Sequence, residues 1–91
     1  MALERFVEAA GAEVFGQRNL PRGGLRIQLR LMGVTRGVTG TTTDNLASNV
    51  ALACLDILGR IGNDGNDSRW PAASEAMDKI RAILDKEGAL A

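Results

Sequence analysis

The residues LRIQLRL, which run from Leu25 to Leu31, alternate strictly between apolar and polar side chains. Successive side chains of a β-strand point to opposite faces, so this pattern predicts a strand with one buried and one solvent-facing side. Leucine and isoleucine occupy the first side, and the second side carries Arg26, Gln28 and Arg30. The fold must therefore cover a leucine face and provide a role for an arginine face.

A partner strand is predicted directly after the first, because an isolated strand leaves its backbone groups unpaired. The dipeptide Arg36-Gly37 separates two β-branched Val-Thr pairs. Glycine readily supplies the positive φ that a tight hairpin turn requires. We therefore predict a hairpin of residues 25–35 against residues 38–42, with its tip at Arg36-Gly37 and a bulge at Met32-Gly33.

The spacing of apolar residues predicts three helices around this hairpin. Gly16 is expected to cap the first helix, and residues 17–24 are expected to form a loop. Thr41 and Asp44 have the spacing of a capping box at the start of the second helix. The predicted helices span Leu3 to Phe15, Thr42 to Gly59–Gly62, and Pro71 to Glu87.

These elements predict a small α+β domain with the order α-β-β-α-α, formed by residues 1–91 as a single unit. A two-stranded sheet is marginally stable and keeps both of its edges open. The helix that begins near Thr42 is also too apolar for two short helices to cover it. Both deficits favour a homodimer, formed either by continuing the sheet or by packing these helices together.

Composition argues against catalysis. The chain has no histidine, the commonest general base and metal ligand, and it has neither a phosphate-binding loop nor a dinucleotide motif. Its single cysteine, Cys54, lies in an apolar run and is interpreted as core packing. We therefore predict a non-enzymatic protein without a cofactor. No apolar run of about 18 residues and no leader-like start occur, so we expect a cytoplasmic protein that does not contact membranes.

Charge is segregated along the chain although 11 basic and 11 acidic residues balance overall. No acidic residue lies between Glu13 and Asp44, whereas five arginines do. The planar guanidinium group pairs bidentately with carboxylates and phosphates. These arginines and the glutamine of the strand predict an anion-binding surface; an alternative is that they pair with this chain's own glutamates, such as those of the first helix. The candidate residues are Arg18, Arg22, Arg26, Gln28, Arg30 and Arg36.

The favoured hypothesis is a small regulatory or inhibitory interaction module that binds an acidic macromolecule through the arginine-bearing strand. Nucleic-acid binding by the same surface is the first alternative, but zero net charge and a shortage of aromatic residues favour an acidic protein. The second alternative is a structural or assembly subunit that associates through a sheet edge or a helix. Val38 and Trp70 are the candidate interface residues.

The segment between the last two helices partly matches the pattern of a calcium-binding loop. Four oxygen-bearing residues occupy positions one, three, five and twelve of a calcium-loop pattern: Asp64, Asn66, Ser68 and Glu75. Position six, where such a loop needs glycine, is Arg69. The pattern therefore favours a plain connecting turn over a metal site.

Overall fold

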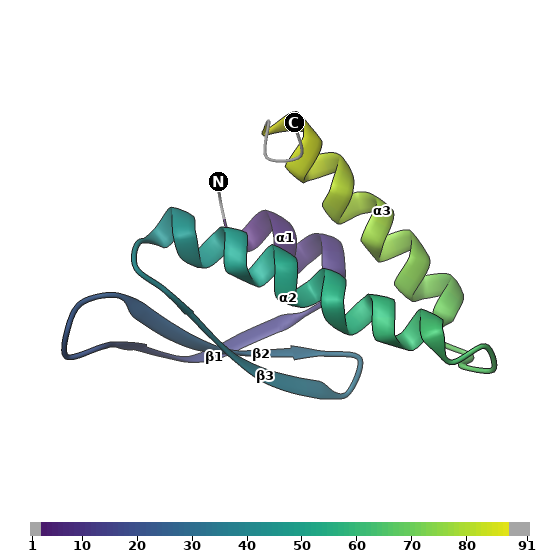
Figure 1. Cartoon of the computed structure of the whole chain (residues 1–91), viewed down its shortest axis with the longest axis horizontal. Helices are drawn as coiled ribbons and strands as arrows, with labels where there is room; N and C mark the ends of the chain where they lie inside the picture. Colours follow the sequence, from purple (N-terminus) through teal and green to yellow (C-terminus); the bar gives the residue numbers. More distant parts are fainter. Residues whose placement is uncertain (1–2, 88–91) are drawn as a thin grey trace.

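The computed structural model describes residues 3–87, and it forms an α+β domain in which three helices lie on one side of a three-stranded sheet (Figure 1). The predicted α+β class is confirmed, but the order is α-β-β-β-α-α, with one strand more than predicted. The sheet is antiparallel with the order β1-β2-β3. Its elements are α1 (Leu3–Ala10), β1 (Glu13–Asn19), β2 (Leu25–Leu31), β3 (Val34–Gly40), α2 (Thr43–Asn63) and α3 (Trp70–Lys86).

The alternating stretch is the central strand, β2, and its predicted faces are confirmed. Ile27, Leu29 and Leu31 are buried beneath the helices. Arg26 and Gln28 are only partly buried and Arg30 is exposed, because they project from the opposite side of the sheet. Alternation along seven residues was sufficient to fix this strand, since a shift by one residue would bury the arginines.

The first helix is shorter than predicted because the chain turns at Gly11. The φ of Gly11 is 65°, and the backbone N–H of Ala12 donates to the carbonyl of Val7 at 2.9 Å. The N–H of Gly11 donates to the carbonyl of Glu8 at 3.1 Å, which completes a Schellman end. The prediction of a helix to Phe15 is therefore wrong, and the residues after Ala12 form β1 instead.

Gly16 interrupts the pairing of β1 with β2 instead of capping a helix. Phe15 is opposite Gln28 and Arg18 is opposite Arg26, so two residues of β1 face a single residue of β2. The φ of Gly16 is 63°, as expected for the first residue of a glycine-type β-bulge. The predicted loop consequently begins later, after Asn19, and it is a short turn that returns the chain to β2.

The hairpin tip lies at Met32-Gly33, four residues before the predicted tip. Both residues have positive φ, 49° and 81°, as a two-residue type I′ turn requires. Arg36 and Gly37 lie inside β3, which pairs with β2 from Leu31↔Val34 to Leu25↔Gly40. Both Met32-Gly33 and Arg36-Gly37 offer a glycine for a turn, but only a turn at Met32-Gly33 lets all seven residues of β2 pair with β3. Met32 consequently adopts a positive φ, which is uncommon for a residue other than glycine.

The two long helices have nearly the predicted bounds. The hydroxyl of Thr42 accepts the N–H of Asn45 at 3.0 Å, and the side chain of Asn45 accepts the N–H of Thr41 at 2.9 Å. The capping pair is thus shifted by one residue from the predicted Thr41 and Asp44. In α3, Pro71 occupies the first turn as predicted.

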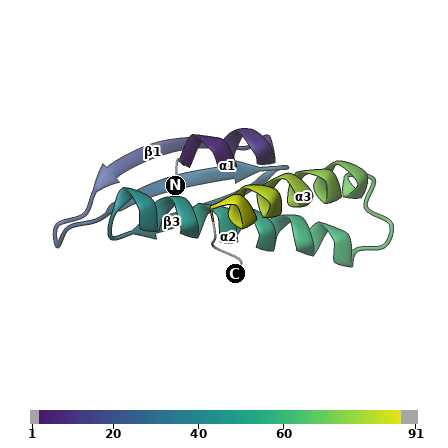
Figure 2. The ribbon, with the colours of Figure 1, turned by 90° about the horizontal axis from the view of Figure 1, so that it is seen from above.

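The core lies between the sheet and the helices, and α2 contacts β3, β2, α1 and α3 (Figures 1 and 2). Phe6, Leu58 and Ile80 bring the three helices together without exposed surface. Much of the apolar surface of α2 that favoured a dimer is therefore covered within the chain, although Leu52 remains 58% exposed. Within the described residues, no helix combines the length and apolarity needed to span a bilayer.

Candidate functional site

The face of the sheet turned away from the helices, called the outer face here, has no covering element among residues 3–87 (Figure 1). Paired residues of neighbouring strands project from the same face, so the strand register defines its members. The outer face consists of Glu13, Phe15 and Arg18 from β1, Arg26, Gln28 and Arg30 from β2, and Thr35, Gly37 and Thr39 from β3.

Two guanidinium groups rest on specific neighbours of this face. The guanidinium carbon of Arg30 lies 5.0 Å from the centre of the Phe15 ring, a cation–π contact. Arg26 lies over the backbone of Gly37, so closely that a Cβ at Gly37 would be 2.7 Å from its Nη2 atom. Phe15 and Gly37 were not among the predicted site residues. Only the strand register reveals them, because it places both residues opposite Gln28.

Within residues 3–87, the arginines of the outer face form no ion pair, and only Arg30 has an acidic residue, Glu13, directly opposite it in the register. Arg18 and Arg26 are direct cross-strand neighbours, a like-charge arrangement that disfavours the folded state. No salt bridge within the described residues engages either of them, Arg30, or Arg22 in the turn between β1 and β2. The alternative that α1 neutralises these arginines lacks support, because α1 lies on the other side of the sheet (Figure 1).

Arg36 is separated from the other predicted arginines. It lies opposite Leu29, on the helix side of the sheet, where its Nη1 atom donates to Asp56 at 2.7 Å. Arg60 donates to the same carboxylate at 3.3 Å. The Arg36 hydrogen bond, followed by that of Arg60, lowers the pKa of Asp56. Arg36 therefore has a partner within the chain.

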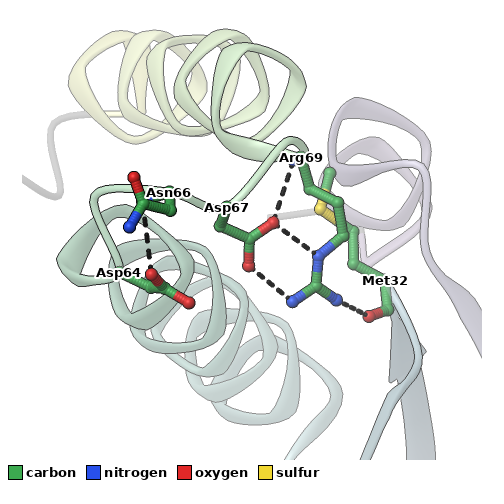
Figure 3. Close-up of polar contacts among 5 residues, drawn as sticks. All are labelled: Met32, Asp64, Asn66, Asp67 and Arg69. Atoms are coloured by element: carbon green, nitrogen blue, oxygen red, sulfur yellow. Dashed lines mark hydrogen bonds and ion pairs between the residues drawn. The ribbon is translucent and has the colours of Figure 1, made fainter.

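A second arginine with internal partners connects the hairpin tip to the loop between α2 and α3 (Figure 3). Arg69 donates from Nη1 to the carbonyl of Met32 at 2.6 Å, and from Nη2 and Nε to the Asp67 carboxylate at 2.7 and 3.0 Å. The hydrogen bonds that Asp67 accepts from the side chain and the backbone N–H of Arg69 lower its pKa to about 2. Sequence reasoning treated Arg69 only as an obstacle to a calcium loop, although the spacing of Asp67 and Arg69 permits this pairing.

The four calcium candidates are not assembled into a cation site. Asp64 accepts the backbone N–H of Asn66 at 3.2 Å, as in an ordinary polar turn (Figure 3). Glu75 lies within α3, where it pairs with Lys79 at 3.4 Å. Over residues 3–87, no group of three or more acidic or cysteine side chains is placed to hold a metal ion.

A hollow of about 250 Å³ lies beside this loop, between the start of β3 and the end of α2. Its floor is apolar, and the three arginines at its rim already donate to Asp56 or Asp67. It therefore offers little uncompensated charge to a ligand. The lining residues are Val34, Arg36, Ile57, Arg60, Ile61, Asp64, Asp67 and Arg69.

The other residues singled out in the sequence, Val38, Trp70 and Cys54, contribute mainly to packing. Val38 is 7% exposed, as part of the core, and the Trp70 ring packs against Gly62 while staying 39% exposed. Burial raises the pKa of the Cys54 thiol to about 11, so Cys54 is a poor nucleophile at neutral pH.

The edges of the sheet are less available for pairing than its outer face. On β3, the side-chain amide of Asn49 donates to the carbonyl of Thr39 at 2.8 Å, which occupies one edge acceptor. On β1, the bulge at Gly16 breaks the regular ladder that an added strand would follow. Bulges and covered edge groups are common protections against edge-to-edge association.

Comparison of the chain with protein-family models, with curated proteins and with solved structures finds no match.

Proposed function

We propose that this protein is a non-enzymatic interaction module that binds an acidic macromolecule through the outer face of its sheet. The observation that supports this most strongly is the pairing of Arg18 directly opposite Arg26 on an uncovered face, without an acidic partner in residues 3–87. Like charges held together disfavour the free protein, and an anionic partner relieves their repulsion.

An acidic protein surface fits this face better than nucleic acid does. Zero net charge provides little of the general attraction that phosphate-backbone binding needs. Phe15, the single aromatic residue of the face, already has Arg30 over its ring, so it is a poor platform for stacked bases.

The proposed role is regulatory or inhibitory, because a bound partner would have part of its own acidic surface masked. We retain the expectation of a cytoplasmic homodimer as part of this proposal. The exposed side chain of Leu52 and the strand edges are available to such a dimer, and sedimentation equilibrium would detect it. Assembly through an edge has less support as the main function, since both edges carry protective features.

The test compares wild-type protein with the double variant Arg26→Ala/Arg30→Ala. Fluorescence anisotropy would measure binding to labelled poly-L-glutamate and to single- and double-stranded DNA and RNA oligonucleotides, each at two salt concentrations. We expect poly-L-glutamate to bind, and the double variant to bind at least about tenfold more weakly because two charge-assisted contacts are lost. The matched control is Arg81→Ala/Lys86→Ala, which removes two exposed positive charges from α3.

Two results would contradict the proposal in different ways. Tighter binding to oligonucleotides than to poly-L-glutamate, with steep salt dependence, would favour the nucleic-acid alternative. Equal binding of poly-L-glutamate by the double variant and the wild type would remove the outer face as the binding site.

A further inference from the structure

Arg26 and Arg30 each rest on a residue of the same cross-strand row of the sheet. Phe15, Gln28 and Gly37 are cross-strand partners, so they form a line perpendicular to the strands. Arg30 leans over Phe15 on β1, and Arg26 leans over Gly37 on β3. Three residues lie between Arg26 and Arg30 along β2, and the residues on which they rest, Gly37 and Phe15, lie on either side of Gln28. The strands that carry these two residues, β1 and β3, are two inter-strand spacings apart, or about 10 Å.

Gly37 is explained by the guanidinium that rests on it. Its φ is outside the left-handed region, so the backbone does not require glycine at this position. Glycine within a strand is otherwise unfavourable, because it gains no packing and loses more conformational freedom on folding. A Cβ at Gly37 would lie 2.7 to 3.4 Å from three atoms of the Arg26 guanidinium group, and these three are its nearest neighbours. The absent side chain thus creates a seat for Arg26.

Phe15 provides the corresponding seat for Arg30. A guanidinium held over a ring keeps its N–H groups directed outward in its own plane, where they can donate to a carboxylate. An arginine that is already ordered loses less conformational freedom on binding than a freely rotating one. The two seats therefore prepare two planar donors in advance of the partner.

We infer that Arg26 and Arg30, seated on Gly37 and Phe15, form a two-pronged carboxylate receptor that selects a partner with two carboxylates about 10 Å apart. This inference rests on the proposed function and adds a recognition geometry to it. Gln28, between the prongs, supplies an amide for the partner's backbone or side chain. Gly37 and Phe15 are positioning residues, since they act through the arginines.

Rigid polyproline peptides serve as molecular rulers for this spacing. In a polyproline II helix, residues three apart share a side and are separated by about 9 Å, whereas residues six apart are separated by about 19 Å. The short ruler contains Glu-Pro-Pro-Glu and the long ruler contains two glutamates separated by five prolines. Binding is followed by NMR through the Nε–H signals of Arg26 and Arg30.

We expect both signals to shift together with the short ruler, with at least about threefold tighter binding than to the long ruler. Gly37→Ala should displace Arg26 while preserving all charges, and Phe15→Leu should release Arg30. Each substitution should abolish the preference for the short ruler. Thr35→Ala, on the same face of β3, is the matched control and should retain the preference.

The outcomes separate this inference from the proposed function. Equal affinity of the wild type for the two rulers, or an unchanged preference in both Gly37→Ala and Phe15→Leu, overturns the two-pronged receptor. The same holds if neither ruler binds while poly-L-glutamate still binds in an Arg26- and Arg30-dependent manner. If the wild-type protein does not bind poly-L-glutamate, or binds it independently of Arg26 and Arg30, the proposed function itself fails.

Discussion

Each face of the sheet includes an arginine and a glycine, but the two faces give these residues different chemical surroundings. On the inner face, Arg36 reaches a carboxylate of α2, and Gly40 allows α2 to approach the end of β3. On the outer face, Arg26 has no acid within residues 3–87, and Gly37 accommodates the guanidinium itself. The difference indicates that an arginine stabilises this fold where the chain supplies its counter-charge, and is available for binding where the chain does not.

The largest expected effect separates the two glycines of β3. A Cβ at Gly40 would lie 2.5 Å from backbone atoms of Leu46, so Gly40→Ala forces β3 and α2 apart. We expect it to reduce the free energy of unfolding by about 1–3 kcal/mol. Gly37→Ala meets only the movable end of Arg26, and its free energy of unfolding should stay within about 0.5 kcal/mol of wild type.

Urea denaturation of both variants measures this difference directly. Equal destabilisation by the two substitutions would show that the outer position is also structurally constrained, and the contrast between the faces would be lost. Retention of the wild-type m-value would verify that both variants unfold from the same native state.

A smaller effect is expected from the arginine with internal partners in the loop. The pKa of Asp67 is lowered from 3.8 to about 2 by its hydrogen bonds to Arg69. Its ionised form therefore stabilises the folded state above pH about 4, and this stabilisation disappears as the pH falls through about 2. Arg69→Gln should return the pKa of Asp67 toward 3.8 and flatten the acid limb of the stability curve.

Carboxyl ¹³C NMR and urea midpoints at several acidic pH values measure these two changes. Arg26→Gln is the matched control, because it removes a guanidinium that contacts no acid in the described chain. An unchanged pKa of Asp67 in Arg69→Gln would mean that the pairing in Figure 3 is not maintained in solution.

The parts of the fold that were predictable are those dictated by residue period. The alternation of β2 and the helical spacing of α2 and α3 each extend over several turns or repeats, so one interpretation dominates. The first helix was overextended because Val14 continues the helical spacing beyond Gly11. The Schellman end at Gly11 and the tertiary pairing of β1 with β2 together override that local pattern.

The candidate site was predictable as a charge pattern but not as an arrangement. Alternation located Arg26 and Arg30 on one face, whereas the fate of Arg36 depended on the position of the hairpin turn. Two local signals, at Met32-Gly33 and at Arg36-Gly37, competed for that turn, and the choice decides which side of the sheet Arg36 faces. The seats on Phe15 and Gly37 require the strand register, which no local pattern contains.

The smallest expected effect tests the like-charge pair. Arg18→Gln removes the charge opposite Arg26 and keeps a polar side chain on the exposed strand. We expect it to raise the free energy of unfolding by about 0.3 kcal/mol at low ionic strength, because cross-strand repulsion is relieved. Added salt screens exposed charges, so the gain should shrink as ionic strength rises. Arg81→Gln on α3 is the control, and it should show no such salt-dependent gain. Destabilisation by Arg18→Gln at low salt would mean that Arg18 has a favourable electrostatic environment, and the face would then lack the excess charge that makes an acidic partner favourable.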